Sequence, residues 1–213
     1  MNTNQLPSYD PVKRNVEKDS GGEELSPMDP PGAYAPPKKE SVPYEDLHPF
    51  LQKIMDDHRE FEKEIDAFEK ALHAIPEEGI TKEIDTSLRH FFQFFDEQLN
   101  EHTQIEEKRL FTILQQRLLE KGEHSNGPEK TTAMDMFEDD HTKAVQLAAV
   151  IFNFLGLVAR LPDPKSRLMV LDVALEQGNA LVELLRLHIF REDHVMIPQA
   201  HQYINKEELN GME

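Results

Sequence analysis

The feature that most constrains this chain is a repeated unit in which a histidine and a glutamate stand four residues apart. The two copies are His102-x-x-x-Glu106 and His188-x-x-x-Glu192. On a helix, residues four apart are separated by about 6 Å along the axis and point the same way, so each pair presents its imidazole and its carboxylate on one face. An Asp-Asp-His triplet precedes each copy at a similar distance and ends at His58 and His141. We therefore read the chain as two copies of one helical unit.

Four long segments carry apolar residues at alternating steps of three and four, the pattern of helices packed in a bundle. The expected helices span residues 44–73, 81–121, 130–160 and 165–197. The breaks between them contain proline or glycine, and no segment shows the two-residue alternation of a strand. The sequence therefore predicts an all-α fold, an antiparallel four-helix bundle.

Proline and glycine set the expected ends of two helices. Pro76 with Gly79 is expected to end the first helix, and Pro198 is expected to end the fourth. Further positions that the stripes assign to the core are Ile113, Phe152, Leu168 and Val195.

The chain divides into a bundle and two flanking tails. Residues 1–42 are rich in proline and glycine and have no apolar period, which predicts a disordered N-terminal tail. Residues 43–200 carry the four helices, and residues 201–213 are expected to form a polar C-terminal tail. No secretory signal is visible at the start of the chain. The longest apolar run, residues 147–159, is shorter than the roughly 20 residues that a membrane span needs.

Charge and composition narrow the classes of function. The formal net charge is −18, which argues against nucleic acid and against an anionic membrane surface as partners. The chain contains no cysteine, so disulfides, thiolate metal sites, iron–sulfur clusters and thiol nucleophiles are excluded. The lack of cysteine fits a reducing compartment, and we expect a cytoplasmic protein.

Six polar residues occupy stripe positions where apolar side chains are expected. An unpaired buried polar group costs about 1–3 kcal/mol and a buried carboxylate costs more. Six of them would remove most of the stability of a typical domain. Either a hydrogen-bonded histidine–carboxylate network or bound metal must compensate, and the repetition in register with the core favours metal. The candidate ligands are His58, His102, Glu106, His141, His188 and Glu192.

The types of these side chains limit the metal. Imidazole and carboxylate ligands without sulfur suit iron, manganese or zinc. If both glutamates bridge two ions, each ion has two histidines and two oxygen donors, and iron keeps positions free for solvent and a small exogenous ligand. A ferritin-like site needs two Glu-x-x-His motifs in mid-helix. Glu138 with His141 fits once and Glu45 with His48 sits at a helix start, but neither belongs to a repeated mid-helix pattern, and the repeat here has the reverse order, so we reject it. The remaining histidines fall off the stripes and are expected on the surface: His48, His73, His90, His124, His194 and His201.

This arrangement resembles the hemerythrin family, specifically the bacterial hemerythrin-like (HHE cation-binding) domains, over residues 44–200. The segments that carry the resemblance are Asp57-His58-Arg-Glu60, His102-x-x-x-Glu106-Glu107-x-x-Leu110-Phe111 and His188-x-x-x-Glu192-Asp193-x-x-x-Ile197-Pro198. The resemblance implies a non-haem centre of two Fe ions in a four-helix bundle, with the six residues above as ligands and the two glutamates as bridges.

The sequence departs from the oxygen-carrying hemerythrins in two places. They place two histidines four apart on the third helix, whereas here Val145 follows His141 at that spacing. The wider family, in which sensing of iron, oxygen or nitric oxide and stress responses occur, fits better. They also end on His-x-x-x-x-Asp, and here both Glu192 and Asp193 are available. Register with Glu106 favours Glu192, while Glu107 and Asp193 form an alternative pair of ligands.

Three hypotheses of function follow. The first is a non-haem di-iron protein that binds oxygen, nitric oxide or iron itself for sensing, storage or a stress response, with a small diatomic molecule as its partner. The second is a di-iron oxidase or peroxide-consuming enzyme, which ranks lower because no additional acid, base or substrate pocket is legible. The third is a metal-independent helical interaction module that uses residues 1–42 for docking. The sequence does not indicate a protein partner.

Overall fold

The computed structural model describes residues 42–212, and over these residues the protein is helical with no strand. The expected all-α fold is therefore confirmed. The predicted disordered tail, residues 1–42, lies outside the described part of the chain except for Val42. A short 3₁₀ turn, η2 (Tyr44–Asp46), leads into the first long helix.

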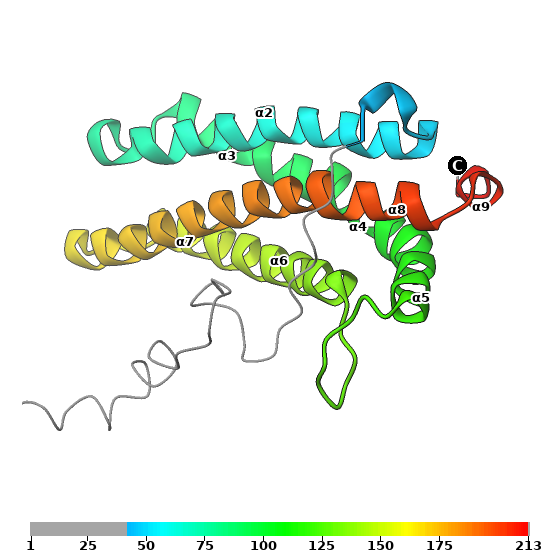
Figure 1. Ribbon diagram of the computed structural model, residues 1–213. Coiled ribbons are helices and arrows are strands. Elements are labelled where there is room, and N and C mark those ends of the chain that lie inside the picture. Colours follow the sequence, from blue (N-terminus) through cyan, green and yellow to red (C-terminus); the bar gives the residue numbers. More distant parts are fainter. Residues whose placement is uncertain (1–41, 213) are drawn as a thin grey trace, which may run out of the picture.

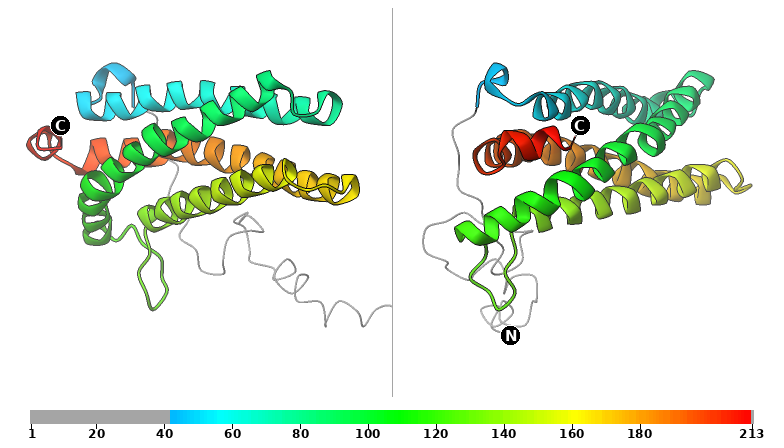
Figure 2. Two further views of the ribbon diagram at one scale, coloured as in Figure 1. Left: turned by 180° about the vertical axis from the view of Figure 1, so that it is seen from behind. Right: turned by 90° about the vertical axis from the view of Figure 1, so that its right-hand side faces the viewer.

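Four long helical rods form an antiparallel bundle, in which the first and third rods run in one direction and the second and fourth run in the other (Figures 1 and 2). Two rods contain π-helical turns, which hold one residue more than an α-helical turn. The first rod is α2 (Pro49–Glu78) and the third is α6 (Ala133–Val158). The second rod is α3 (Lys82–Phe94), η3 (Phe95–Leu99), α4 (Asn100–Ile105), η4 (Glu106–Phe111) and α5 (Thr112–Lys121). The fourth is α7 (Pro164–Arg191), η5 (Glu192–Met196) and α8 (Ile197–Tyr203).

Capping residues in the sequence set the starts of three rods. The hydroxyl of Thr81 accepts a hydrogen bond from the amide of Ile84 at the start of α3. Thr132 and Asp135 form a reciprocal capping box at the start of α6. Asp163 accepts from the amide of Ser166 at the start of α7. Each cap satisfies an amide that the first helical turn leaves without a partner.

Gly79 ends the first long helix as expected, whereas neither Pro76 nor Pro198 ends a helix. Pro76 lies in the last turn of α2, which continues to Glu78 and stops at Gly79 with φ 70°. Pro198 lies just after the junction of η5 and α8, and the fourth rod continues past it to Tyr203.

The C-terminal residues, which we expected to form a polar tail, pack apolar side chains into the core. A short helix, α9 (Lys206–Asn210), follows α8 and begins with a capping box at Asn205. The side chains of Ile204, Leu209 and Met212 are buried in the core. Only Leu209 lies within the five-residue helix α9, and Ile204 and Met212 flank it, so these residues produce no readable helical period.

The core consists of two apolar clusters with a polar layer between them. One cluster centres on the stacked rings of Phe68 and Phe91, whose centroids lie 3.9 Å apart. The other gathers Phe111, Phe137 and the buried C-terminal residues. Between these clusters the rods present buried histidines and glutamates. The core stripes are thus interrupted at one common depth, as a shared site requires.

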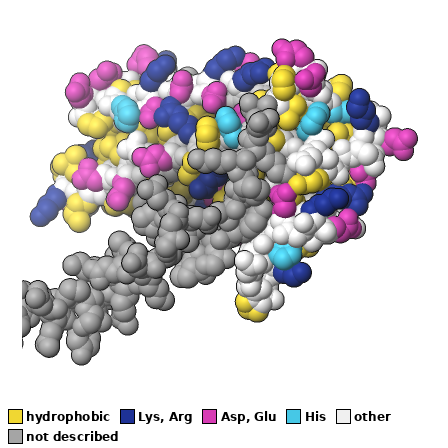
Figure 3. Space-filling model, in the orientation of Figure 1, with side chains coloured by type: hydrophobic (Ala, Val, Ile, Leu, Met, Phe, Trp, Pro, Cys, Tyr) yellow, Lys and Arg dark blue, Asp and Glu magenta, His cyan; other side chains and the backbone are white. Residues whose placement is uncertain are grey.

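Some expected core positions lie on the surface instead. Phe152 is 59% exposed and Leu168 is 61% exposed, while the neighbouring Ile151 is fully buried. Apolar side chains gather on the surface at the end of the bundle where α6 gives way to α7, and charged side chains of both signs cover α2 (Figure 3). Although the run at residues 147–159 is short, α6 as a whole has the length and composition of a membrane span. Such a helix also occurs in the bundles of soluble proteins, so this is weak evidence for a membrane.

Candidate metal centre

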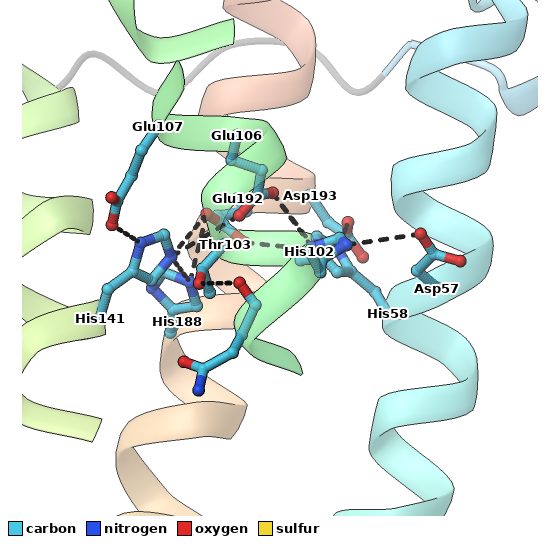
Figure 4. Close-up of polar contacts among 11 residues, drawn as sticks. Asp57, His58, His102, Thr103, Glu106, Glu107, His141, His188, Glu192 and Asp193 are labelled. Carbon is cyan, nitrogen blue, oxygen red and sulfur yellow. Dashed lines mark hydrogen bonds and ion pairs between the residues drawn. The ribbon is translucent and has the colours of Figure 1, made fainter. Parts of the chain in front are cut away.

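The polar layer contains all six residues that the sequence analysis selected, brought together from four rods (Figure 4). We call them the inner six. The side chains of Glu106 and Glu192 are fully buried, and the four histidines are each less than a tenth exposed. They divide into two overlapping groups that share both glutamates. The first group is His58, His102, Glu106 and Glu192, and the second is His141, His188, Glu106 and Glu192.

In the first half of the layer, two imidazoles meet through their Nε2 atoms. The Nε2 atoms of His58 and His102 lie 3.1 Å apart. Glu106 Oε1 lies 3.2 Å from Nε2 of His102, and Glu192 Oε2 lies 3.2 Å from Nε2 of His58. Two nitrogens and two oxygens from different glutamates therefore face one point.

The second half repeats this arrangement with the remaining two histidines. The Nε2 atoms of His141 and His188 lie 3.0 Å apart. Glu192 Oε1 lies 3.2 Å from Nε2 of His188, and Glu106 Oε2 lies 3.6 Å from Nε2 of His141. Each glutamate thus turns one oxygen toward each half, which is the orientation of a carboxylate that bridges two ions.

The donor set fits a pair of metal ions. All four oxygens of Glu106 and Glu192 are buried, and none makes a hydrogen bond within residues 42–212. Leaving buried carboxylates without partners is costly, whereas cations would satisfy every one of these oxygens. Two nitrogens that each lie about 2.1 Å from one ion and at right angles are about 3 Å apart. The Nε2 separations in both halves match that value.

A second ring of carboxylates surrounds the imidazoles on their outer side. Each Nδ1 atom faces one carboxylate, and we call these four residues the outer carboxylates. Their distances to Nδ1 are 2.7 Å from Asp193 to His58, 3.4 Å from Asp57 to His102, 2.8 Å from Glu107 to His141 and 3.8 Å from Asp140 to His188. An imidazole that donates Nδ1–H to a carboxylate leaves the lone pair on Nε2 for a metal.

Local helix geometry explains how neighbouring acids reach different places. The π-helical turns η4 and η5 begin at Glu106 and Glu192. In each turn the first acid enters the layer, and the next acid, Glu107 or Asp193, reaches an outer Nδ1. Single π-helical turns inside α-helices occur frequently at functional sites, which agrees with their position here.

The buried charges shift the protonation of the metal-free chain. Burial lowers the pKa of His58, but the hydrogen bond to Asp193 and the attraction of the nearby Glu192 carboxylate outweigh it and raise the pKa to about 9. Burial likewise lowers the pKa of His102 and His188, and the attraction of Glu106 and Glu192 respectively raises each to about 10. For Glu192, burial raises the pKa, but the charges of His188 and His58 hold it well below its usual range. Without metal, attraction between these three histidines and the buried carboxylates therefore favours the imidazolium form of the three rings.

A small cavity adjoins the layer. Its volume is about 30 Å³, which exceeds the space that one water molecule needs. Its walls include the four histidines of the layer together with the apolar side chains of Phe61, Phe94, Leu99 and Val145. Val145 thus lines the cavity at the position where the oxygen-carrying hemerythrins have another histidine. The cavity can admit a molecule of a few atoms to the edge of the layer.

The histidines that the sequence analysis placed on the surface lie away from the layer. His73, His90, His194 and His201 are exposed. The other two are half-buried: His48 contacts Asn210, and His124 contacts the backbone of Ser125.

The outer carboxylates were only partly anticipated. Glu107 and Asp193 were considered as ligands, but they face Nδ1 atoms rather than the centre. Asp57 and Asp140 received no role, although both precede a repeated histidine. The signal that could have identified them is the acid directly before His58 and His141 and the acid directly after Glu106 and Glu192.

Comparison with known proteins gives one match. A family model described as Hemerythrin HHE cation binding domain matches residues 50–200, which contain the whole layer. No curated protein and no solved structure matches the chain.

Proposed function

Because the chain belongs to the hemerythrin HHE cation binding domain family, we propose that it holds two iron ions between the inner six and binds a small diatomic molecule, oxygen or nitric oxide, beside them. Such binding would serve sensing, storage or a stress response. We further propose a cytoplasmic location, in keeping with a chain that has no cysteine.

The observation that supports this proposal most directly is the pair of fully buried glutamates whose four oxygens make no hydrogen bond within residues 42–212. Without metal, histidine nitrogens lie 3.2–3.6 Å from these oxygens but donate no hydrogen bond to them. Two cations would satisfy them and join the halves through both carboxylates. Iron is the metal that the family resemblance implies, and its preference for six ligands leaves coordination positions open for a small molecule.

The chain's own residues would control what reaches that pair. The imidazoles would present Nε2, and the outer carboxylates would hold their orientation. The cavity of about 30 Å³ would admit a ligand of a few atoms, and a second pocket of about 360 Å³, lined by Asp57, His102 and Glu106, would also reach the layer. The phenylalanine rings on the wall of the smaller cavity would exclude bulk water, which favours small apolar molecules over ions.

Anaerobic loading with Fe(II), followed by oxygen, tests the proposal. We expect about two irons per chain by elemental analysis, because two groups of ligands share the glutamates. Oxygen should then produce the absorption of an oxo-bridged iron pair. The variant His102→Ala should retain about one iron, and the exposed histidine variant His90→Ala should behave as the unaltered protein.

Two results would change the assignment. A folded, colourless protein that binds no iron after loading would rule out the proposal. Steady consumption of hydrogen peroxide that is lost in His102→Ala would assign the protein to the enzyme alternative instead.

A further inference from the structure

Two of the outer carboxylates face a histidine from their own half of the chain, and the other two face a histidine from the opposite half. The first half comprises α2 and the second rod, and the second half comprises α6 and the fourth rod. Asp57 faces His102 within the first half, and Asp140 faces His188 within the second. Asp193 of the second half faces His58 of the first, and Glu107 of the first half faces His141 of the second.

The crossed contacts are the shorter ones. Asp193 Oδ1 lies 2.7 Å from Nδ1 of His58, and Glu107 Oε1 lies 2.8 Å from Nδ1 of His141. The contacts within one half measure 3.4 Å and 3.8 Å. Charge-assisted hydrogen bonds are strongest near 2.7–2.9 Å, so both crossed contacts are strong hydrogen bonds. Within one half, the bond from His102 to Asp57 is long, and Nδ1 of His188 makes no hydrogen bond to Asp140.

The geometry points to Glu107 and Asp193 as crossed positioning residues, each of which fixes the ring orientation and the Nδ1–H tautomer of a histidine in the opposite half. This inference rests on the proposed metal pair. Each half would then depend on the other twice, through a shared glutamate inside the layer and through a carboxylate outside it. The acid that follows each bridging glutamate would therefore act on the ion held by the other half.

This crossing predicts a pattern that a general structural role would not produce. The variant His188→Ala keeps only the metal position of His58 and His102 complete. The variant His102→Ala keeps only the metal position of His141 and His188 complete. Asp193→Asn should weaken metal binding only in the first background, and Glu107→Gln only in the second. Losses of outer-shell partners typically weaken metal binding about 10-fold to 100-fold.

We would titrate these four double variants with Co(II), whose visible absorption reports its ligands. The expected result is at least about 10-fold weaker binding for the matched combination and a change of less than about 3-fold for the mismatched one. Equal weakening in both backgrounds, or none in either, would overturn the inference. If the unaltered protein itself binds no Co(II) or Fe(II), the proposed function fails instead.

A second measurement decides the matter if the single-position backgrounds bind too weakly to titrate. Histidine ¹⁵N NMR of the otherwise unaltered chain loaded with Zn(II) should show Nδ1–H signals from the buried imidazoles. Asp193→Asn should shift the His58 signal and leave that of His141, while Glu107→Gln should do the reverse. Coincident shifts at both histidines, or at neither, would contradict the crossed assignment.

Discussion

The two halves of the layer present nearly the same inner side chains but place them in different surroundings. In the first half, the outer partner of His102 is Asp57, whose side chain is 40% exposed. In the second half, the partner of His188 is Asp140, whose side chain is 5% exposed. Asp140 also lies 3.5 Å from Arg191 and 3.8 Å from Lys143. The two halves thus share nearly the same inner geometry, but the outer carboxylate is exposed in the first half and buried beside two cationic side chains in the second.

This difference separates what the inner residues do from what their surroundings do. An exposed carboxylate is hydrated and screened, so its effect on a neighbouring imidazole is small. A buried carboxylate depends on its partners, and removing it leaves their charges uncompensated. The halves should therefore respond alike to changes in the inner six and unequally to changes in the outer carboxylates.

The largest expected effect comes from a residue that the halves share. Glu106→Ala should lose iron from both halves, whereas His188→Ala should lose only one ion, because Glu106 faces both pairs of histidines. Binding at 100 to 1,000 times the dissociation constant stabilises a folded chain by about 3–4 kcal/mol. We expect that gain to vanish in Glu106→Ala, as measured by iron content and by urea unfolding with and without chelator. Equal iron loss in the two variants would mean that the glutamate does not join the halves.

An intermediate effect should distinguish the outer surroundings. In the metal-free chain, Asp140→Ala should cost about 1–3 kcal/mol, because it removes a buried partner of Arg191. Asp57→Ala should cost less than about 1 kcal/mol because that carboxylate is partly hydrated. Lys143→Ala is a control expected to stay within about 0.5 kcal/mol, since its side chain is 60% exposed. Urea unfolding measures all three, and equal costs for the two aspartates would remove the distinction between the halves.

The smallest expected difference between the halves is in their response to pH. In the metal-free chain the pKa values of His102 and His188 are both raised to about 10, from 6.5. A raised pKa contributes stability that is fully present below pH 6.5 and is lost as pH rises through about 10. His102→Gln and His188→Gln should therefore flatten the pH dependence of the unfolding free energy over this window by similar amounts. A clear inequality between these variants would show that the outer carboxylates also control protonation.

The sequence predicted the number of rods and the depth of the layer, because both depend on apolar period and on polar residues that interrupt it. It placed the core one residue too early on the C-terminal side of Glu106 and of Glu192, the residues at which η4 and η5 begin. Ile113 and Val195 were expected inside, but they are only partly buried, and Leu114 and Met196 are fully buried instead. A stripe drawn with the α-helical period cannot register the extra residue of such a turn.

The outer partners could not be predicted from spacing alone. Whether Asp193 turns toward the centre or toward His58 depends on how the fourth rod faces α2. The misplacement of Phe152 has a similar cause. Residues 151 and 152 both fit the stripe of α6, and packing buries the first while Phe152 lies at the edge against Phe92, with ring centroids 5.4 Å apart. Such choices are made by tertiary contacts rather than by local pattern.

The widened turns at Glu106 and Glu192 also bear on how this fold tolerates insertions and deletions. Removing one residue from η4, such as Lys108, would return it to α-helical geometry and rotate the following helix by about 100° relative to the layer. The apolar face of α5 would then point away from its neighbours. A one-residue deletion within η4 or η5 is therefore expected to be structurally significant. The extra residue in each turn lets one continuous rod both supply a glutamate to the layer and bury the apolar face of the helix that follows.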